Sequence, residues 1–214
     1  NNTFLKAHKK YFMDLKKSNL EILDIGCGYG DKTFPLSFED NFIDFVDSDS
    51  YRLSLIPQNK NIMTYESDAI EFLISNKKNY DVIFCIDIIE HIEKKSQLFF
   101  IDLLIKNLKP NGTLLLQTIN SSSPFSNIYF YGDITHTRIF SYQLLENHLR
   151  KNYKKNDYCI RNTPCLTYKS LITRWLISFP ILLIFNFIPK LGLGIKEKLN
   201  LFTVNYLCIF KKNY

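Results

Sequence analysis

The sequence has 214 residues and a mass of 25.3 kDa, which suits one large domain better than two. Hydrophobic residues make up 46% and charged residues 22%, which excludes a disordered chain, a collagen-like fibre and a small disulfide-stabilised protein. The net charge is +6, but only five of the 27 basic residues are arginine, the residue whose fork recognises bases and phosphates. We therefore expect no nucleic-acid partner.

The five cysteines are odd in number, widely spaced and free of any C-x-x-C pair. This pattern predicts reduced thiols and neither a disulfide framework nor a zinc site. We therefore expect a cytoplasmic protein.

Strand and helix patterns alternate along most of the chain. Residues 1–20 predict a leading helix, and helices are also predicted at 51–56, 69–77 and 94–108. This alternation is typical of an α/β fold with a mostly parallel sheet and helices on both faces. The predicted strands are Glu21–Ile25, Phe42–Val46, Ile62–Tyr65, Asp81–Ile86 and Thr113–Thr118.

The first crossover, between the first two predicted strands, contains Pro35 inside the expected helix. Because proline removes a backbone hydrogen bond, this helix should be shortened or kinked. Neither an internal repeat nor a low-complexity linker interrupts the sequence, so we predict a single domain over residues 1–214.

The first predicted strand runs into the glycine-rich sequence DIGCGYG, in which Gly26, Gly28 and Gly30 alternate with other residues. Such glycines let a backbone bend sharply and approach a ligand closely. The dinucleotide fingerprint needs a glycine where Asp31 stands, and an anion there would repel a pyrophosphate. The loop therefore favours a nucleoside ligand without phosphates; taken alone, it would also suit a tight strand-to-helix turn.

Acidic residues follow the next predicted strands. Asp47 ends the second strand about twenty residues after the glycine loop, where a carboxylate is placed to bind ribose hydroxyls. Asp49 is expected to cap the next helix. Asp68 follows the third strand and is placed to meet an adenine amine, and the fourth strand ends in the sequence DIIEH, residues 87–91.

In this order and spacing, these segments resemble the successive motifs of class I S-adenosylmethionine-dependent methyltransferases. The resemblance covers residues 20–150, and a last strand at Thr203–Phe210 would complete the seven-stranded, Rossmann-like sheet of that superfamily. Within the superfamily, DIIEH and the later THTRIFS resemble small-molecule and glycan O-methyltransferases of the ubiquinone-pathway type. The segments that carry the resemblance are Glu21–Gly30, Asp47, Ser67–Ala69, Tyr80–Ile92 and Leu108–Asn120.

The resemblance implies S-adenosylmethionine as the cofactor and residues 20–150 as the core that binds it. The methionine end would lie against the glycine loop, the ribose against Asp47 and the adenine near Asp68. The cofactor-binding residues implied in this way are Asp24, Gly26, Cys27, Gly28, Asp47, Ser48, Asp68, Ala69 and Asp87.

An alcohol or phenol acceptor must lose its proton when it takes the methyl group, so a positioned base is expected. His91 stands at the carboxyl end of the fourth predicted strand, where open α/β sheets place their ligands. His136 lies in a loop after the fifth strand and can reach the same cleft. The structural alternatives are that His91 caps a helix and that His136 is a loop histidine hydrogen-bonded to the backbone. We predict His91, His136 and Glu90 as catalytic residues.

The sequence also predicts a possible divalent metal site with mixed oxygen and nitrogen ligands, and the metal ion would lower the pKa of an acceptor hydroxyl. Its ligands would be Asp87, Glu90, His91 and His136. The set resembles the E-x-x-E-H motif and later histidine of small-RNA 2′-O-methyltransferases, except that Asp87 replaces the first glutamate. At this point both a metal-assisted and a metal-free mechanism stay open.

Residues 165–200 predict an apolar helical insertion before the last strand. Its most apolar part, 171–188, is too short and interrupted for a membrane span, which needs about twenty residues. One interpretation is packing on the core or on a second copy in a homodimer. The other is contact with a membrane surface, where the segment would serve a lipid-linked acceptor.

The sequence therefore predicts an S-adenosylmethionine-dependent methyltransferase acting on a hydroxyl of a small-molecule or glycan intermediate. One alternative is a metal-assisted O-methyltransferase for RNA ends, which the scarcity of arginine disfavours. The other is a non-catalytic cofactor-binding subunit, which the intact glycine loop disfavours.

Overall fold

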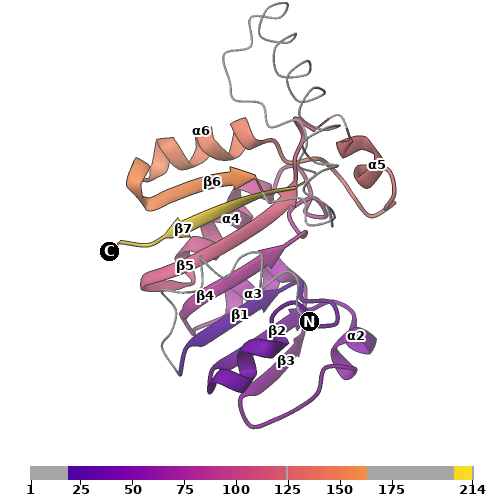
Figure 1. Cartoon of the computed structure of the whole chain (residues 1–214), viewed down its shortest axis with the longest axis vertical. Helices are drawn as coiled ribbons and strands as arrows, with labels where there is room; N and C mark the ends of the chain where they lie inside the picture. Colours follow the sequence, from indigo (N-terminus) through magenta and orange to yellow (C-terminus); the bar gives the residue numbers. More distant parts are fainter. Residues whose placement is uncertain (1–18, 124, 163–204, 214) are drawn as a thin grey trace, which may run out of the picture.

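The computed structural model describes residues 19–123, 125–162 and 205–213 (Figure 1). The predicted apolar insertion at 165–200 lies outside the described residues, and so does the predicted leading helix apart from its last two positions. Across the described ranges, no helix combines the length and apolar character that crossing a bilayer requires.

Seven strands form one sheet in the order β3-β2-β1-β4-β5-β7-β6 (Figure 1). Strands β1 to β5 pair in parallel, whereas β7 runs antiparallel to both β5 and β6. The predicted seven-stranded, mostly parallel sheet is confirmed. The strands are β1 (Glu21–Ile25), β2 (Phe42–Asp47), β3 (Ile62–Glu66), β4 (Tyr80–Ile86), β5 (Leu108–Ile119), β6 (Tyr158–Asn162) and β7 (Asn205–Lys211).

Helices cover both faces of the sheet, as predicted. One buried cluster joins the sheet to α3 (Ala69–Ser75), α4 (Gln97–Lys106) and α6 (Tyr142–Asn152). A second cluster joins the opposite face to η2 (Phe34–Glu39) and α2 (Ser50–Ser54). The short elements α5 (Ser126–Phe130) and η3 (Lys155–Asp157) precede and follow α6.

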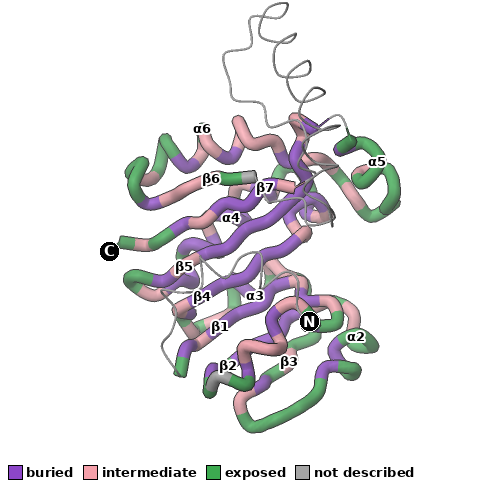
Figure 2. The backbone as a smooth tube through the Cα atoms, in the orientation of Figure 1, coloured by how far each residue is buried: buried purple, intermediate pink, exposed green. Residues whose placement is uncertain are grey.

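The central strands are buried on both faces, as Figure 2 shows by the purple over most of β4 and the second half of β5. Successive residues of a strand point to opposite faces, so Ile83 belongs to the first cluster and Phe84 to the second. Covering both faces explains why these strands are almost entirely apolar in sequence.

Two local irregularities have sequence causes. Pro35 stands in the first turn of η2, which is a 3₁₀ helix of 6 residues, so the predicted shortening of this helix is confirmed. Strand β5 begins at Leu108, earlier than predicted, because Leu108 pairs with Tyr80 before the register shifts. Asn111 in that segment adopts a φ of 64°, a left-handed conformation that asparagine tolerates.

Because neighbouring parallel strands end at the same edge, the loops after β1, β2 and β4 come together at the carboxyl edge of the sheet. These loops contain the glycine sequence, Asp47 and the DIIEH motif. The fold therefore places most of the predicted site residues at one edge.

Candidate functional site

The glycine loop leaves β1 with three glycines in the left-handed region, Gly26, Gly28 and Gly30, at φ of 66°, 56° and 66°. A Cβ added at Gly26 would lie 2.0 Å from Cδ1 of Ile88, and one at Gly30 would lie 3.0 Å from the Phe45 ring. At Gly28 it would meet nothing within 4 Å. The loop is therefore packed against the protein at Gly26 and Gly30 and open at Gly28.

Asp47, the last residue of β2, holds this loop. Its Oδ2 accepts a hydrogen bond from the Gly28 amide at 2.7 Å, and its Oδ1 accepts one from the Asp49 amide at 2.9 Å. Asp49 caps α2 by accepting from the Arg52 amide at 3.2 Å, so its predicted role is confirmed. Ser48, between them, is exposed. The Asp47 carboxylate is thus fixed beside the open glycine.

The two other predicted residues of this loop are buried. Asp24 is 4% exposed, and its carboxylate accepts a hydrogen bond from the Thr33 hydroxyl. Burial raises the pKa of Asp24 to about 7, with the Thr33 hydrogen bond opposing the shift. Burial also raises the pKa of the Cys27 thiol, which donates to the Gly28 carbonyl at 3.6 Å. Both side chains support the glycine loop from its buried, core-facing side.

Asp68 and Ala69 lie at the start of α3. The Asp68 carboxylate is exposed, and its Oδ1 accepts hydrogen bonds from the amides of Ile70 at 2.8 Å and Glu71 at 3.1 Å. Asp68 is therefore the N-cap of α3, and the half-buried Ala69 is the first helical residue.

Asp87 begins the DIIEH motif in the left-handed region, at a φ of 61°. Its Oδ2 accepts from Lys32 Nζ at 3.2 Å, and its Oδ1 accepts from Gln117 Nε2 at 3.1 Å. This unusual backbone conformation directs the carboxylate toward Lys32, in the segment that follows the glycine loop.

Glu90 is turned into the protein. Its side chain is 1% exposed, and its Oε2 accepts a hydrogen bond from the Thr118 hydroxyl at 2.9 Å. Burial, with Asp87 adding to it, raises the pKa of Glu90 to about 7. The Glu90 carbonyl accepts from the amide of Thr137 at 2.8 Å, which joins the DIIEH loop to the loop that carries His136.

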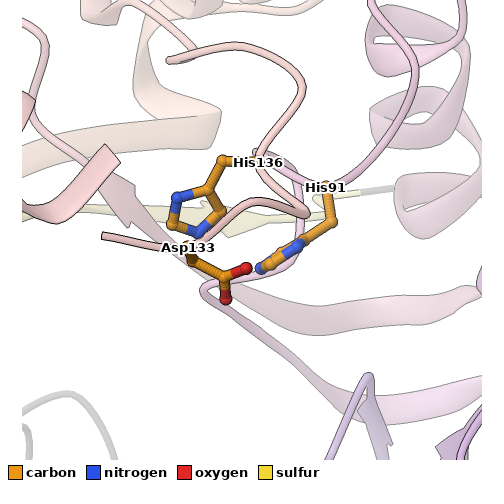
Figure 3. A group of neighbouring side chains, drawn as sticks. All are labelled: His91, Asp133 and His136. Atoms are coloured by element: carbon orange, nitrogen blue, oxygen red, sulfur yellow. The ribbon is translucent and has the colours of Figure 1, made fainter. Parts of the chain in front are cut away.

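His91 and His136 meet at this junction, with ring centroids 4.6 Å apart. Asp133 joins them, and a ligand atom from each of the three residues lies within 4.8 Å of the others. Figure 3 shows the two rings and the carboxylate facing one another. The Phe130 ring stacks on His136 with centroids 5.6 Å apart, which fixes the plane of that imidazole.

The four-residue metal set predicted from sequence is not assembled as such. The structure brings His91 and His136 together, but their carboxylate neighbour is Asp133. Asp87 is held by Lys32 and Gln117, and Glu90 is buried against Thr118. The Asp87 and Glu90 carboxylates are held by these protein partners, and Asp133 supplies the carboxylate that groups with the two imidazoles.

The open side of the glycine loop fits S-adenosylmethionine. Space at Gly28 and the Asp47 carboxylate lie together at the carboxyl edge. The donor set of two imidazoles and one carboxylate likewise fits a divalent metal ion.

Comparison with known proteins agrees with this geometry. A family model described as a methyltransferase domain matches residues 2–171. The chain belongs to this methyltransferase domain family. The predicted membership of the class I S-adenosylmethionine-dependent superfamily is confirmed by this match and by the fold.

Similar curated proteins include two ubiquinone biosynthesis O-methyltransferases. The one from Rickettsia akari is 41% identical over 107 residues, covering 48% of this chain and 41% of the relative. The one from Rickettsia typhi is 35% identical over 130 residues, covering 59% and 50%. The methyltransferase chain described here spans about half the length of the curated relatives it matches.

Solved structures share the fold of this methyltransferase. A SAM-dependent methyltransferase from Archaeoglobus fulgidus superposes with a TM-score of 0.70 at 24% identity, over 99% of this chain and 95% of that one. The plantazolicin methyltransferase BpumL, solved with SAH and a substrate analogue, gives 0.65 at 21% identity, over 99% and 84%. The N-methyltransferase NodS from Bradyrhizobium japonicum gives 0.60 at 14%, over 100% and 90%.

Proposed function

We propose that this methyltransferase transfers the methyl group of S-adenosylmethionine to a hydroxyl of a small molecule, with His91 as the base. The observation that supports it is a hydrogen-bond chain from Asp133 through Thr135 to His91. The Thr135 hydroxyl lies 2.6 Å from Asp133 Oδ1 and 2.9 Å from His91 Nδ1. The O-methyltransferase relatives support the same reaction class.

The chain of hydrogen bonds assigns the tautomer of His91. An ionised carboxylate only accepts, so the single hydroxyl proton of Thr135 goes to Asp133. Thr135 must then accept from His91, which places the imidazole proton on Nδ1 and a lone pair on Nε2. A base with this lone pair, oriented by a second group, is the arrangement that general-base catalysis needs.

The surroundings keep His91 neutral. Burial and then the neighbouring His136 lower the pKa of His91, so its imidazole accepts a proton at neutral pH. His136 Nδ1 donates to the Phe130 carbonyl at 2.9 Å, which in a neutral imidazole places the lone pair on Nε2. His136 Nε2 therefore lies beside His91 as a second acceptor, for a donor group of the substrate other than the hydroxyl that His91 deprotonates.

S-adenosylmethionine, when bound, supplies a methyl group on a sulfonium whose sulfur is the leaving group. The glycine loop and Asp47 hold the cofactor, and Asp24 and Cys27 support the loop from the core side. Nε2 of His91 takes the hydroxyl proton as the acceptor oxygen forms its bond to carbon. Alignment of this kind contributes up to about 7–11 kcal/mol in favourable cases.

A divalent metal at His91, Asp133 and His136 is a second version of this proposal. Both Nε2 lone pairs and the Asp133 carboxylate face one another, which is a two-histidine, one-carboxylate donor set. A metal held there would lower the pKa of an acceptor hydroxyl in place of the histidine base.

We further propose an acceptor with an apolar portion, consistent with a lipid-linked intermediate handled at a membrane surface in the cytoplasm. Large apolar side chains are exposed along residues 128–134, on both sides of Asp133, including Ile128 at 69%, Tyr131 at 79% and Ile134 at 100%. Figure 2 shows this stretch, around α5, in green. The segment 171–188, proposed for membrane or homodimer contact, lies outside the described residues.

A pair of variants tests the base. Thr135→Val removes the hydroxyl that orients His91 and should lower kcat about ten- to a hundredfold on a phenolic acceptor, with little change in the KM for S-adenosylmethionine. Thr135→Ser keeps the hydroxyl and should retain kcat within a few fold. Equal activity of Thr135→Val and wild type would remove His91 from the role of base.

A further inference from the structure

A pocket of about 560 Å³ lies between the start of α4 and the start of α6. Its walls come from residues 93–98, from Thr137 and Arg138 and from Leu144. This volume falls within the range of about 300–1,000 Å³ typical of small-molecule sites. None of its lining residues belongs to the cofactor loop or to the group of His91, Asp133 and His136.

The pocket carries uncompensated positive charge. Its one acidic residue, Glu93, forms an ion pair with Lys95 at 2.9 Å. The remaining cations, Lys94 and Arg138, have no acidic partner among the described residues. Arg138 is half-buried and lines the pocket, and its planar guanidinium offers several donors that match an anionic group.

The start of α4 adds polar groups to the same wall. Gln97 and Leu98 are the first residues of this 10-residue helix, and its N-cap Ser96 makes no capping hydrogen bond through its side chain. The amino end of a helix favours an anion. Gln97 is 1% exposed and donates to the Ile89 carbonyl at 2.9 Å, while its Oε1, which has no partner among the described residues, is an acceptor and suits a donor group of the ligand, not its acidic group.

Apolar groups complete the pocket. Leu98 and Leu144 line it and pack against the hydrophobic core cluster. We propose that this pocket, called here the α4–α6 pocket, binds an organic anion that has an apolar body and one carboxylate, sulfonate or phosphate group. Arg138 and Lys94 bind the acidic group, and the leucines contact the apolar body.

The α4–α6 pocket shares a wall with the loops of the candidate active site. The Thr137 hydroxyl donates to the Ile92 carbonyl at 2.8 Å, and the Thr137 amide donates to the Glu90 carbonyl at 2.8 Å. Thr137 thus fastens the His136 loop to the residues on either side of His91. An anion bound against Arg138 therefore stabilises the loop arrangement that brings the two histidines together.

Two fluorescent probes with the same ring system test the proposal on the full chain. The anionic probe is 8-anilinonaphthalene-1-sulfonate, and N-phenyl-1-naphthylamine lacks its sulfonate. Wild type should bind the anionic probe at one saturable site, and excess S-adenosylhomocysteine should not displace it. Arg138→Gln should weaken its binding about tenfold, the loss expected for one charge-assisted hydrogen bond, and Lys94→Gln should weaken it several fold.

Lys60→Gln is the matched control, because Lys60 is exposed in the loop before β3 and does not line the pocket. It should leave both affinities unchanged, and no variant should alter binding of the neutral probe. Circular dichroism checks that the variants are folded; Lys94 is exposed, so its variant serves even if Arg138→Gln fails that check. The proposal is overturned if both pocket variants bind the anionic probe like Lys60→Gln, or if S-adenosylhomocysteine displaces it.

Discussion

Replacing Gly28 by alanine should weaken cofactor binding far more than it weakens the fold. The φ of 56° at Gly28 is strained for an alanine and costs about 1–2 kcal/mol of the free energy of unfolding. The added Cβ meets nothing within 4 Å in the protein, so packing adds no further cost. The methionine end of the cofactor is proposed to occupy that free space, so the alanine methyl group should obstruct it directly.

Gly30→Ala is the control, because it carries the same kind of strain at a φ of 66° but points inward, 3.0 Å from the Phe45 ring. It should lose about 2–4 kcal/mol of stability, from strain together with overpacking. Denaturant unfolding and calorimetric titration with S-adenosylhomocysteine separate the two effects. We expect at least a thirtyfold loss of affinity in Gly28→Ala and a smaller one in Gly30→Ala. Wild-type affinity in Gly28→Ala would refute the placement of the cofactor.

Three further predictions concern the acids and the metal. Asp47→Ala should weaken S-adenosylhomocysteine binding in calorimetry by about 1.5–3 kcal/mol, because it frees the Gly28 amide and removes an acceptor for ribose hydroxyls, and an unchanged affinity would contradict that role. Folded Glu90 keeps its proton up to about pH 7 whereas the unfolded chain ionises near 4.5, so wild type should lose stability as the pH rises between these values. Glu90→Gln should reduce that loss of stability by up to about 3 kcal/mol, measured by denaturant unfolding at pH 5 and pH 8, whereas the contribution of Asp24 stays. The same pH dependence of stability in Glu90→Gln and wild type would show that Glu90 is ionised in the folded protein. If a metal acts at His91 and His136, excess chelator should suppress turnover, and Mn²⁺ should restore it in wild type but not in Asp133→Asn. Full activity in excess chelator would exclude the metal and leave His91 as the base.

Much of the fold was predictable because the central strands are buried on both faces. The predicted bounds of Glu21–Ile25 match β1, and those of the next two strands fall one residue short at the carboxyl end. The start of β5 was missed because Lys109-Pro110-Asn111-Gly112 has the composition of a turn, yet Leu108 pairs with Tyr80. That pairing depends on a register shift, which local sequence does not encode.

The candidate site was predictable where a residue's role depends on its place at a strand end. Asp47 and the glycine loop are of this kind. Asp133 and Thr135 were missed, although the Asp-x-Thr-His order at 133–136 is a signal: Asp133 accepts from both the amide and the hydroxyl of Thr135. Side-chain direction was the obstacle, because spacing alone does not show that Asp87 adopts a left-handed backbone that turns its carboxylate toward Lys32.

The fate of a radiolabelled methyl group tests directly whether this methyltransferase methylates a hydroxyl of a small molecule. Purified protein is incubated with methyl-labelled S-adenosylmethionine and a panel of phenolic acceptors, with matched amines and an RNA oligonucleotide as competitors, and the product is identified by mass spectrometry. We expect label on a hydroxyl oxygen of a small acceptor, and at least a hundredfold less label with His91→Asn. Label found only on nitrogen or on RNA, or undiminished transfer by His91→Asn, would contradict this expectation.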